Sequence, residues 1–210
     1  MTDQPQNLNR RRKVRALLAG GLVLGIGAAI TLAAWTDNVF GNSDFATGDD
    51  AWNIQADFTP AGVGTWIEAD VSPGEPFTFP ATRLDLTPGD TVYAPVALRL
   101  EPGQTLDAAV TLNGATGGTT DPALTAALRY TVTQGGTSAD CTAGTPGPTA
   151  LVTDALLTTG SVANAITLDA DATPVDLCFA VTLPAGSPNT LSGLATGQVV
   201  WEFVGTSVTP

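Results

Sequence analysis

The side chains that could do chemistry in this 210-residue chain are mostly carboxylates. There are 20 acidic and 8 basic residues, two cysteines and no histidine, and Lys13 is the only lysine. Without histidine, the chain has no Ser-His-Asp triad, no Cys-His dyad and no HExxH zinc site. Without a lysine beyond Lys13, the body of the protein cannot form a Schiff base. We therefore expect no catalytic residues, no bound cofactor and no enzymatic activity.

The two cysteines are Cys141, in a stretch rich in Gly, Thr and Pro, and Cys178, in a predicted strand. In an exported protein an even number of cysteines is typical of a disulfide. A bond across their separation of 37 residues would stabilise the fold by roughly 4 kcal/mol in the chain-entropy model. Redox or nucleophilic chemistry is the alternative, but almost no cations are present to lower a thiol pKa. We expect a disulfide that fastens the loop 134–150 to the rest of the domain.

Carboxylates occur in clusters that could supply oxygen ligands to Ca²⁺, which takes six to eight of them. One cluster is Asp169, Asp171 and Asp176, and another is Asp57, Glu68 and Asp70. Neither matches an EF-hand loop, and an acidic surface that keeps the protein soluble is the simpler interpretation. We keep the first three aspartates as candidate calcium ligands. Paired carboxylates could also hydrolyse glycosidic bonds, but no motif supports that chemistry.

Charge is divided sharply along the chain. Five of the eight basic residues lie within positions 10–15, whereas the residues after Ala33 include 3 basic and 19 acidic side chains, a net charge of −16. Such an acidic body repels nucleic acid and anionic lipid. Neither is therefore an expected partner.

Residues 1–33 have the pattern of a secretory signal peptide. A basic n-region, 10–15, precedes an apolar h-region, 16–33, which ends in small residues. The basic side should stay in the cytoplasm, so the rest of the chain is expected outside, secreted or at the cell surface. The apolar run is also long enough to remain as an N-terminal anchor. Contact with the membrane is expected only through such an uncleaved signal.

The residues that follow have the pattern of an all-β protein. Short alternating runs occur at 91–100, 106–112, 129–133, 176–183 and 198–204. The one short helix candidate is 121–128. Gly and Pro account for close to a fifth of the residues after Ala33 and mark turns between the runs. This predicts a jelly-roll-like antiparallel β-sandwich over residues 49–210, preceded by an N-terminal signal helix.

Several ordered motifs carry a resemblance to a known family. They are Thr31–Asp37 with Gly41-Asn42 and Phe45–Gly48, then Leu84–Asp90, Leu177–Pro184 and Val200–Phe203. Together they resemble proteins of actinobacterial type exported with a SipW-dependent (alternate) signal, and the related TasA/camelysin biofilm-matrix family. The resemblance implies a jelly-roll fold, cleavage between Ala33 and Ala34 by a dedicated signal peptidase, and a role in the extracellular matrix. The metallopeptidase activity attributed to camelysins is not expected, because this chain has no histidine.

The segment 34–48 is open to two interpretations. It places Trp35, Val39, Phe40 and Phe45 among polar residues that suit a strand. The segment is either the first strand of its own sandwich or a donor strand that completes the sheet of the next copy, as the resemblance implies. In the second case, edge hydrogen bonds give affinity and apolar side chains fill pockets. The expected partners are then other copies of the chain, in fibres, or other matrix proteins.

The tryptophans suggest an alternative function. Trp35, Trp52, Trp66 and Trp201 could form a platform on which sugars stack, although large aromatic side chains more often belong to a core or an interface. The alternative to a matrix subunit is therefore an extracellular binding module for a glycan, a protein or calcium.

Overall fold

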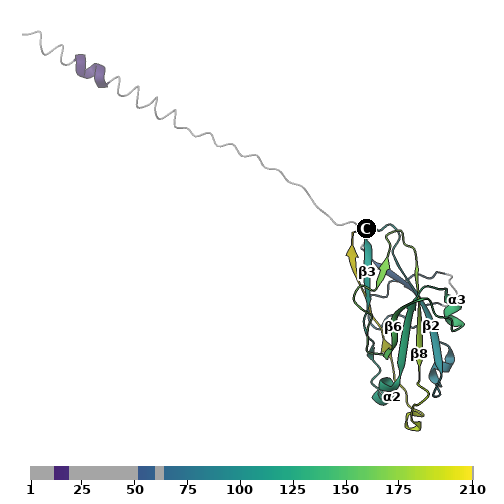
Figure 1. Ribbon diagram of the computed structural model, residues 1–210. Coiled ribbons are helices and arrows are strands. Elements are labelled where there is room, and N and C mark those ends of the chain that lie inside the picture. The colour runs from purple at the N-terminus through teal and green to yellow at the C-terminus, as the bar shows by residue number, and fades with distance from the viewer. Residues whose placement is uncertain (1–11, 19–51, 60–63, 210) are drawn as a thin grey trace, which may run out of the picture. The chain divides into compact units, whose positions relative to one another are not determined.

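The computed structural model describes residues 12–18, 52–59 and 64–209 of the chain (Figure 1). The chain divides into two compact units, Met1–Gly48 and Asp49–Pro210. In the first unit, residues 12–18 form an exposed helix. None of the described helices is long and apolar enough to cross a membrane. The predicted cleavage site at Ala33 and Ala34 and the segment 34–48 lie outside the described residues.

The larger sheet of the second unit has five antiparallel strands in the order β1-β2-β8-β5-β6. The strands are β1 (Ile54–Asp57), β2 (Thr91–Leu100), β5 (Arg129–Gln134), β6 (Thr149–Leu156) and β8 (Val175–Thr182). Figure 1 shows β2, β6 and β8 of this sheet together, with β3 of a second sheet apart from them. The long strand β2 was expected from the alternating run 91–100, and the structure confirms it.

Two smaller antiparallel sheets complete the unit. One has the order β10-β3-β7 and the other pairs β4 with β9. The strands are β3 (Asp107–Leu112), β4 (Thr116–Gly117), β7 (Ile166–Leu168), β9 (Val199–Val200) and β10 (Phe203–Val208). The run 198–204 was expected to be one strand, and this is wrong. The pairing breaks at Trp201 and Glu202, where the Trp201 ring packs among other aromatic rings.

Helical turns are short and lie at the ends of the strands. They are η1 (Ala81–Leu84), α2 (Pro122–Ala127), α3 (Ser138–Thr142) and η2 (Asn189–Leu191). Pro122 opens α2, where its missing N–H costs nothing. Thr137 and Asp140 form a capping box at the start of α3: each side chain accepts a hydrogen bond from the backbone N–H of the other residue.

The core lies between the larger sheet and the β10-β3-β7 sheet. Alternation along β2 buries Val92, Ala94, Val96, Leu98 and Leu100, and along β3 it buries Ala108, Val110 and Leu112. Both sets belong to one apolar cluster, so the two sheets form a β-sandwich. The predicted all-β, antiparallel fold is therefore confirmed for residues 52–59 and 64–209. All described strands, the core and the disulfide lie in this unit, which gives it the means to fold alone.

The predicted disulfide is confirmed. Cys141 in α3 bonds to Cys178 in β8, with their Cα atoms 5.4 Å apart. Cys178 faces outward from the core, in register with Pro95 of β2 and Thr133 of β5. The bond therefore fastens α3 to the outer face of the larger sheet, and the loop 134–150 contains a helix that the sequence did not predict. Such a bond is typical of an oxidising, extracytoplasmic environment.

Pro95 was expected at a sheet edge or a bulge, because proline cannot donate to a strand ladder. Strand β2 lies between β1 and β8 rather than at the edge. However, β1 ends at Asp57, opposite Ala97. At Pro95, β2 therefore pairs with β8 on one side and no longer with β1 on the other, which explains how the sheet tolerates a proline.

Candidate functional site

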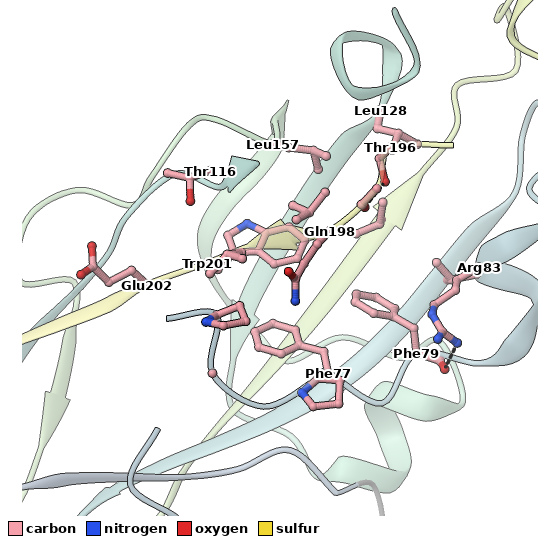
Figure 2. Close-up of a pocket in the computed structure, with 18 of the residues that line it drawn as sticks. Phe77, Phe79, Arg83, Thr116, Leu128, Leu157, Thr196, Gln198, Trp201 and Glu202 are labelled. Carbon is pink, nitrogen blue, oxygen red and sulfur yellow. Dashed lines mark hydrogen bonds between the residues drawn. The ribbon is translucent and has the colours of Figure 1, made fainter. Parts of the chain in front are cut away.

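A groove with a volume of about 1570 Å³ opens along the sandwich (Figure 2). Its walls come from both sheets and from a segment without strands, residues 68–88, which we call the strap. Figure 2 shows Trp201 and Phe77 close together in the groove, with Phe79 and Arg83 of the strap beside them. Aromatic and aliphatic side chains contributed by distant parts of the chain line it together with polar residues such as Glu68, Glu75 and Gln198.

Phe77 lies at the centre of an aromatic cluster in the groove. Its ring stacks on Phe58 at 5.2 Å and on Trp201 at 5.5 Å between centroids, and meets the edge of Phe179 at 4.9 Å. Stacked and edge-to-face pairs at such distances are favourable beyond the area they bury. Phe179 is fully buried, whereas Phe77 and Trp201 are half-buried. The cluster thus connects the core to the open groove.

The strap contacts the groove through two phenylalanines that lie between two prolines. In Pro76-Phe77-Thr78-Phe79-Pro80 the two phenylalanines are half-buried, and Thr78 is exposed. The Thr78 hydroxyl donates a hydrogen bond to the carbonyl oxygen of Phe58 at 2.6 Å. The N–H of Phe79 donates to the carbonyl oxygen of Phe77 at 2.9 Å, so the backbone turns at Thr78, and both phenylalanines line the groove. Phe77 and Phe79 are not among the residues predicted from the sequence, although the alternation of apolar and polar residues here could have indicated them.

One wall of the groove carries an unsatisfied polar atom. The Nε1 of Trp201 is buried and has no hydrogen-bond partner among the described residues. It is turned toward the Tyr130 hydroxyl, which donates to the carbonyl oxygen of Thr159. Burial raises the pKa of Tyr130, and the nearby indole N–H partly offsets this rise. The Trp201 indole N–H is thus buried beside Tyr130 and closed off from solvent.

A pair of carboxylates lies on the opposite, outer face of the larger sheet. Asp57 of β1 and Asp176 of β8 are both in register with Ala97 of β2, so their side chains project from the same face. Asp57 is only 5% exposed and accepts hydrogen bonds from the backbone N–H and the hydroxyl of Thr59. Burial and the negative charge of Asp57 raise the pKa of Asp176. Arg99 of the same face bonds instead to Gln55 and lies over the Trp66 ring.

Asp176 makes a testable contribution to the pH dependence of stability. Its raised pKa means that the folded state binds a proton more tightly than the unfolded state does. This contribution is fully present below the usual value of 3.8 and is lost as the pH rises through the folded-state pKa. We therefore expect wild type to gain stability relative to Asp176→Asn as the pH falls from 7 to 4. Urea unfolding of both proteins at each pH measures the difference.

The control for this prediction is Asp57→Asn, which removes the charge that helps to raise the pKa of Asp176. In the Asp57→Asn protein, the effect of adding Asp176→Asn on the free energy of unfolding should therefore vary less with pH than it does in wild type. A difference that is flat with pH in both backgrounds would contradict the prediction. Each protein must be compared with its own Asp176→Asn variant, because three other aspartates also make stability depend on pH. Hydrogen bonds from neighbouring threonines lower the pKa values of these aspartates, which are Asp90 (bonded by Thr87), Asp140 (by Thr137) and Asp171 (by Thr173). Those three groups act in the opposite direction, since their contribution is lost as the pH falls.

The candidate calcium ligands do not form one cluster in the structure. Asp169 and Asp171 lie in the turn after β7, and Asp171 accepts a hydrogen bond from the N–H of Thr173 at 2.8 Å. Asp176 lies in β8 beside Asp57, a residue of the other predicted cluster. Within residues 12–18, 52–59 and 64–209, no group of three or more Asp, Glu, Cys or His side chains is placed to hold a metal ion. Calcium binding stays a prediction.

The described tryptophans do not share a platform. Trp201 packs against the core, Trp66 lies under the Arg99 guanidinium at 4.2 Å, and the indole of Trp52 donates to the carbonyl oxygen of Leu106. Trp52 and Trp201 both line the groove, whereas Trp66 does not. The structure thus brings two of the predicted residues to one site, and they belong to an apolar groove rather than to a flat stacking surface. No protein-family model matches this chain, and no curated protein is significantly similar to it.

Proposed function

We propose that this chain is a secreted, non-enzymatic structural protein of the extracellular matrix or cell surface that assembles by strand donation. A signal peptidase removes residues 1–33 by cleaving between Ala33 and Ala34. The segment 34–48 of one copy then enters the groove of another copy. The sandwich of residues 49–210 is the receiving, jelly-roll-like domain, and the assembly is a fibre.

The aromatic groove carries this proposal. It lies between two sheets, and β10 is an edge strand of one of them, so an added strand could find backbone partners there. The edge strand β1 of the other sheet is already paired at Ala56 with Ile67.

The segment 34–48 has the composition that the groove would accept. In an extended conformation, Trp35, Val39 and Phe45 share one face. These side chains would contact the rings that line the groove, whereas Thr36, Asn38, Phe40, Asn42 and Asp44 lie on the opposite face. The segment becomes a free terminus only after signal cleavage, so assembly would wait until the chain is outside the cell. The disulfide between Cys141 and Cys178 and the net charge of −16 after Ala33 suit an extracellular protein.

Electron microscopy of purified residues 34–210 and 49–210 tests the proposal. We expect filaments from 34–210 and none from 49–210 at the same concentration and salt. Within 34–210, Phe45→Asp should abolish filaments because it replaces one of the three large apolar side chains of this face by a charge. Asn42→Asp adds a charge on the opposite face and should leave filaments intact. Equal filament yield from 34–210 and 49–210 would eliminate strand donation.

The same samples address the alternative of an extracellular binding module. A binding module should stay monomeric at all concentrations, so sedimentation of 34–210 separates the two functions. Concentration-dependent assembly is expected only of the structural protein.

A further inference from the structure

We infer that the strap is a displaceable plug: in the unassembled protein Phe77 fills the place that an apolar side chain of an incoming donor strand occupies after assembly. This inference rests on the proposed strand donation. It adds that one part of the receiving groove is filled by the chain itself until a second copy displaces the strap. The observations that lead to it are the packing of Phe77, the weak attachment of the strap and the charge of the region.

The packing of Phe77 is that of an inserted side chain. Its ring stacks on Phe79 of the strap at 6.3 Å between centroids. Its shorter ring contacts are with Phe58, Phe179 and Trp201, which come from three separate parts of the chain outside the strap. Phe77 therefore joins the two sheets across the groove in the way that a donor strand's side chain would.

The rest of the strap is held loosely. Residues 68–76 and 80–85 are all exposed. Much of its described hydrogen bonding is internal, such as that from Gly74 to Val71 and that from Arg83 to the carbonyl oxygen of Phe79. The strap forms no strand of its own, apart from the bridge between Ile67 and Ala56 that precedes it. Segments with few buried contacts and an exposed backbone open at low free-energy cost.

Charge does not hold the strap in place. It carries Glu68, Asp70, Glu75 and Asp85 against the single cation Arg83, and it lies on a body that is itself strongly acidic. The strap therefore stays in the groove through Phe77, Phe79 and Leu86 rather than through attraction between charges. A donor strand with three apolar side chains on one face can replace them. Until then, the plug covers apolar surface that would otherwise favour non-specific association.

Trypsin gives a direct measure of strap release. After Ala33 the only basic residues are Arg83, Arg99 and Arg129. Arg99 and Arg129 lie in β2 and β5, whereas Arg83 is exposed in the strap. Folded 49–210 should therefore be cut first at Arg83. A synthetic peptide of residues 34–48 is expected to raise the initial rate of this cut about fivefold or more by displacing the strap, and a scrambled peptide should not.

The second measurement is the affinity of the labelled 34–48 peptide for 49–210 by fluorescence anisotropy. Phe77→Ala is expected to bind about tenfold more tightly than wild type, because the peptide no longer competes with the plug. The matched control is Val71→Ala, in the same strap but 74% exposed and outside the groove lining. It should bind like wild type.

The outcomes separate this inference from the proposed function. If the peptide binds wild type and Phe77→Ala equally and leaves the Arg83 cut unchanged, the plug is wrong and strand donation stands. If the peptide binds none of the three proteins and 34–210 forms no filaments, strand donation is wrong and the plug fails with it. Should Phe77→Ala not fold, the trypsin measurement on the unaltered domain still decides.

Discussion

Replacing Cys141 and Cys178 together by alanine is expected to lower the free energy of unfolding of residues 49–210 by about 4 kcal/mol. The bond closes a loop between residues separated by 37 positions, and its loss returns that loop's freedom to the unfolded chain. For a domain of this size the midpoint of thermal unfolding should fall by about 8–16 °C. Guanidinium unfolding followed by tryptophan fluorescence, together with calorimetry, measures both quantities.

The effect of this double substitution should also have a defined location. Strand β8 keeps its neighbours β2 and β5 without the disulfide, whereas α3 has five residues and is too short to be stable alone. Hydrogen exchange should therefore rise first in α3 and in the loop around it. The chain has no free cysteine, so reduction of wild type is the matched control and should reproduce the result. A loss below about 1 kcal/mol would show that α3 does not depend on the bond.

The strands were largely predictable because their information is local. Alternation along 91–100 reflects the two faces of one extended segment, and β2 has these bounds in the structure. The same holds for Ala108, Val110 and Leu112, which all face the core. The disulfide followed from the number of cysteines and the expected compartment, without any knowledge of distance.

The groove could not be read in the same way. Phe77 contacts Phe58, Phe179 and Trp201, and nothing in the short-range pattern indicates that these residues meet. The pairing of Asp57 with Asp176 likewise depends on the register of two strands on either side of Ala97. A run such as 198–204 alternates as a strand should, yet tertiary packing of Trp201 interrupts it. These features arise from long-range packing, which overrides local propensity.

Core and groove meet at Phe179, so its substitution should have a large effect on stability. Phe179 is fully buried in β8 and contacts the rings of Phe77, Tyr130, Trp201 and Phe203. Truncation to alanine removes the ring and leaves a cavity that the two sheets cannot close, so we expect Phe179→Ala to cost about 3–5 kcal/mol of unfolding free energy. Urea unfolding of residues 49–210 measures this loss.

The matched comparison separates burial from aromatic packing. Phe179→Leu keeps most of the apolar volume and should cost less than about 1.5 kcal/mol. Phe77→Ala, at the half-buried end of the same cluster, should cost clearly less than Phe179→Ala because its site opens into the groove. If Phe77→Ala were as costly as Phe179→Ala, the strap would be an integral part of the core and not a segment that a second copy can displace. The ratio of the two losses thus tests whether the sandwich is already complete without the strap.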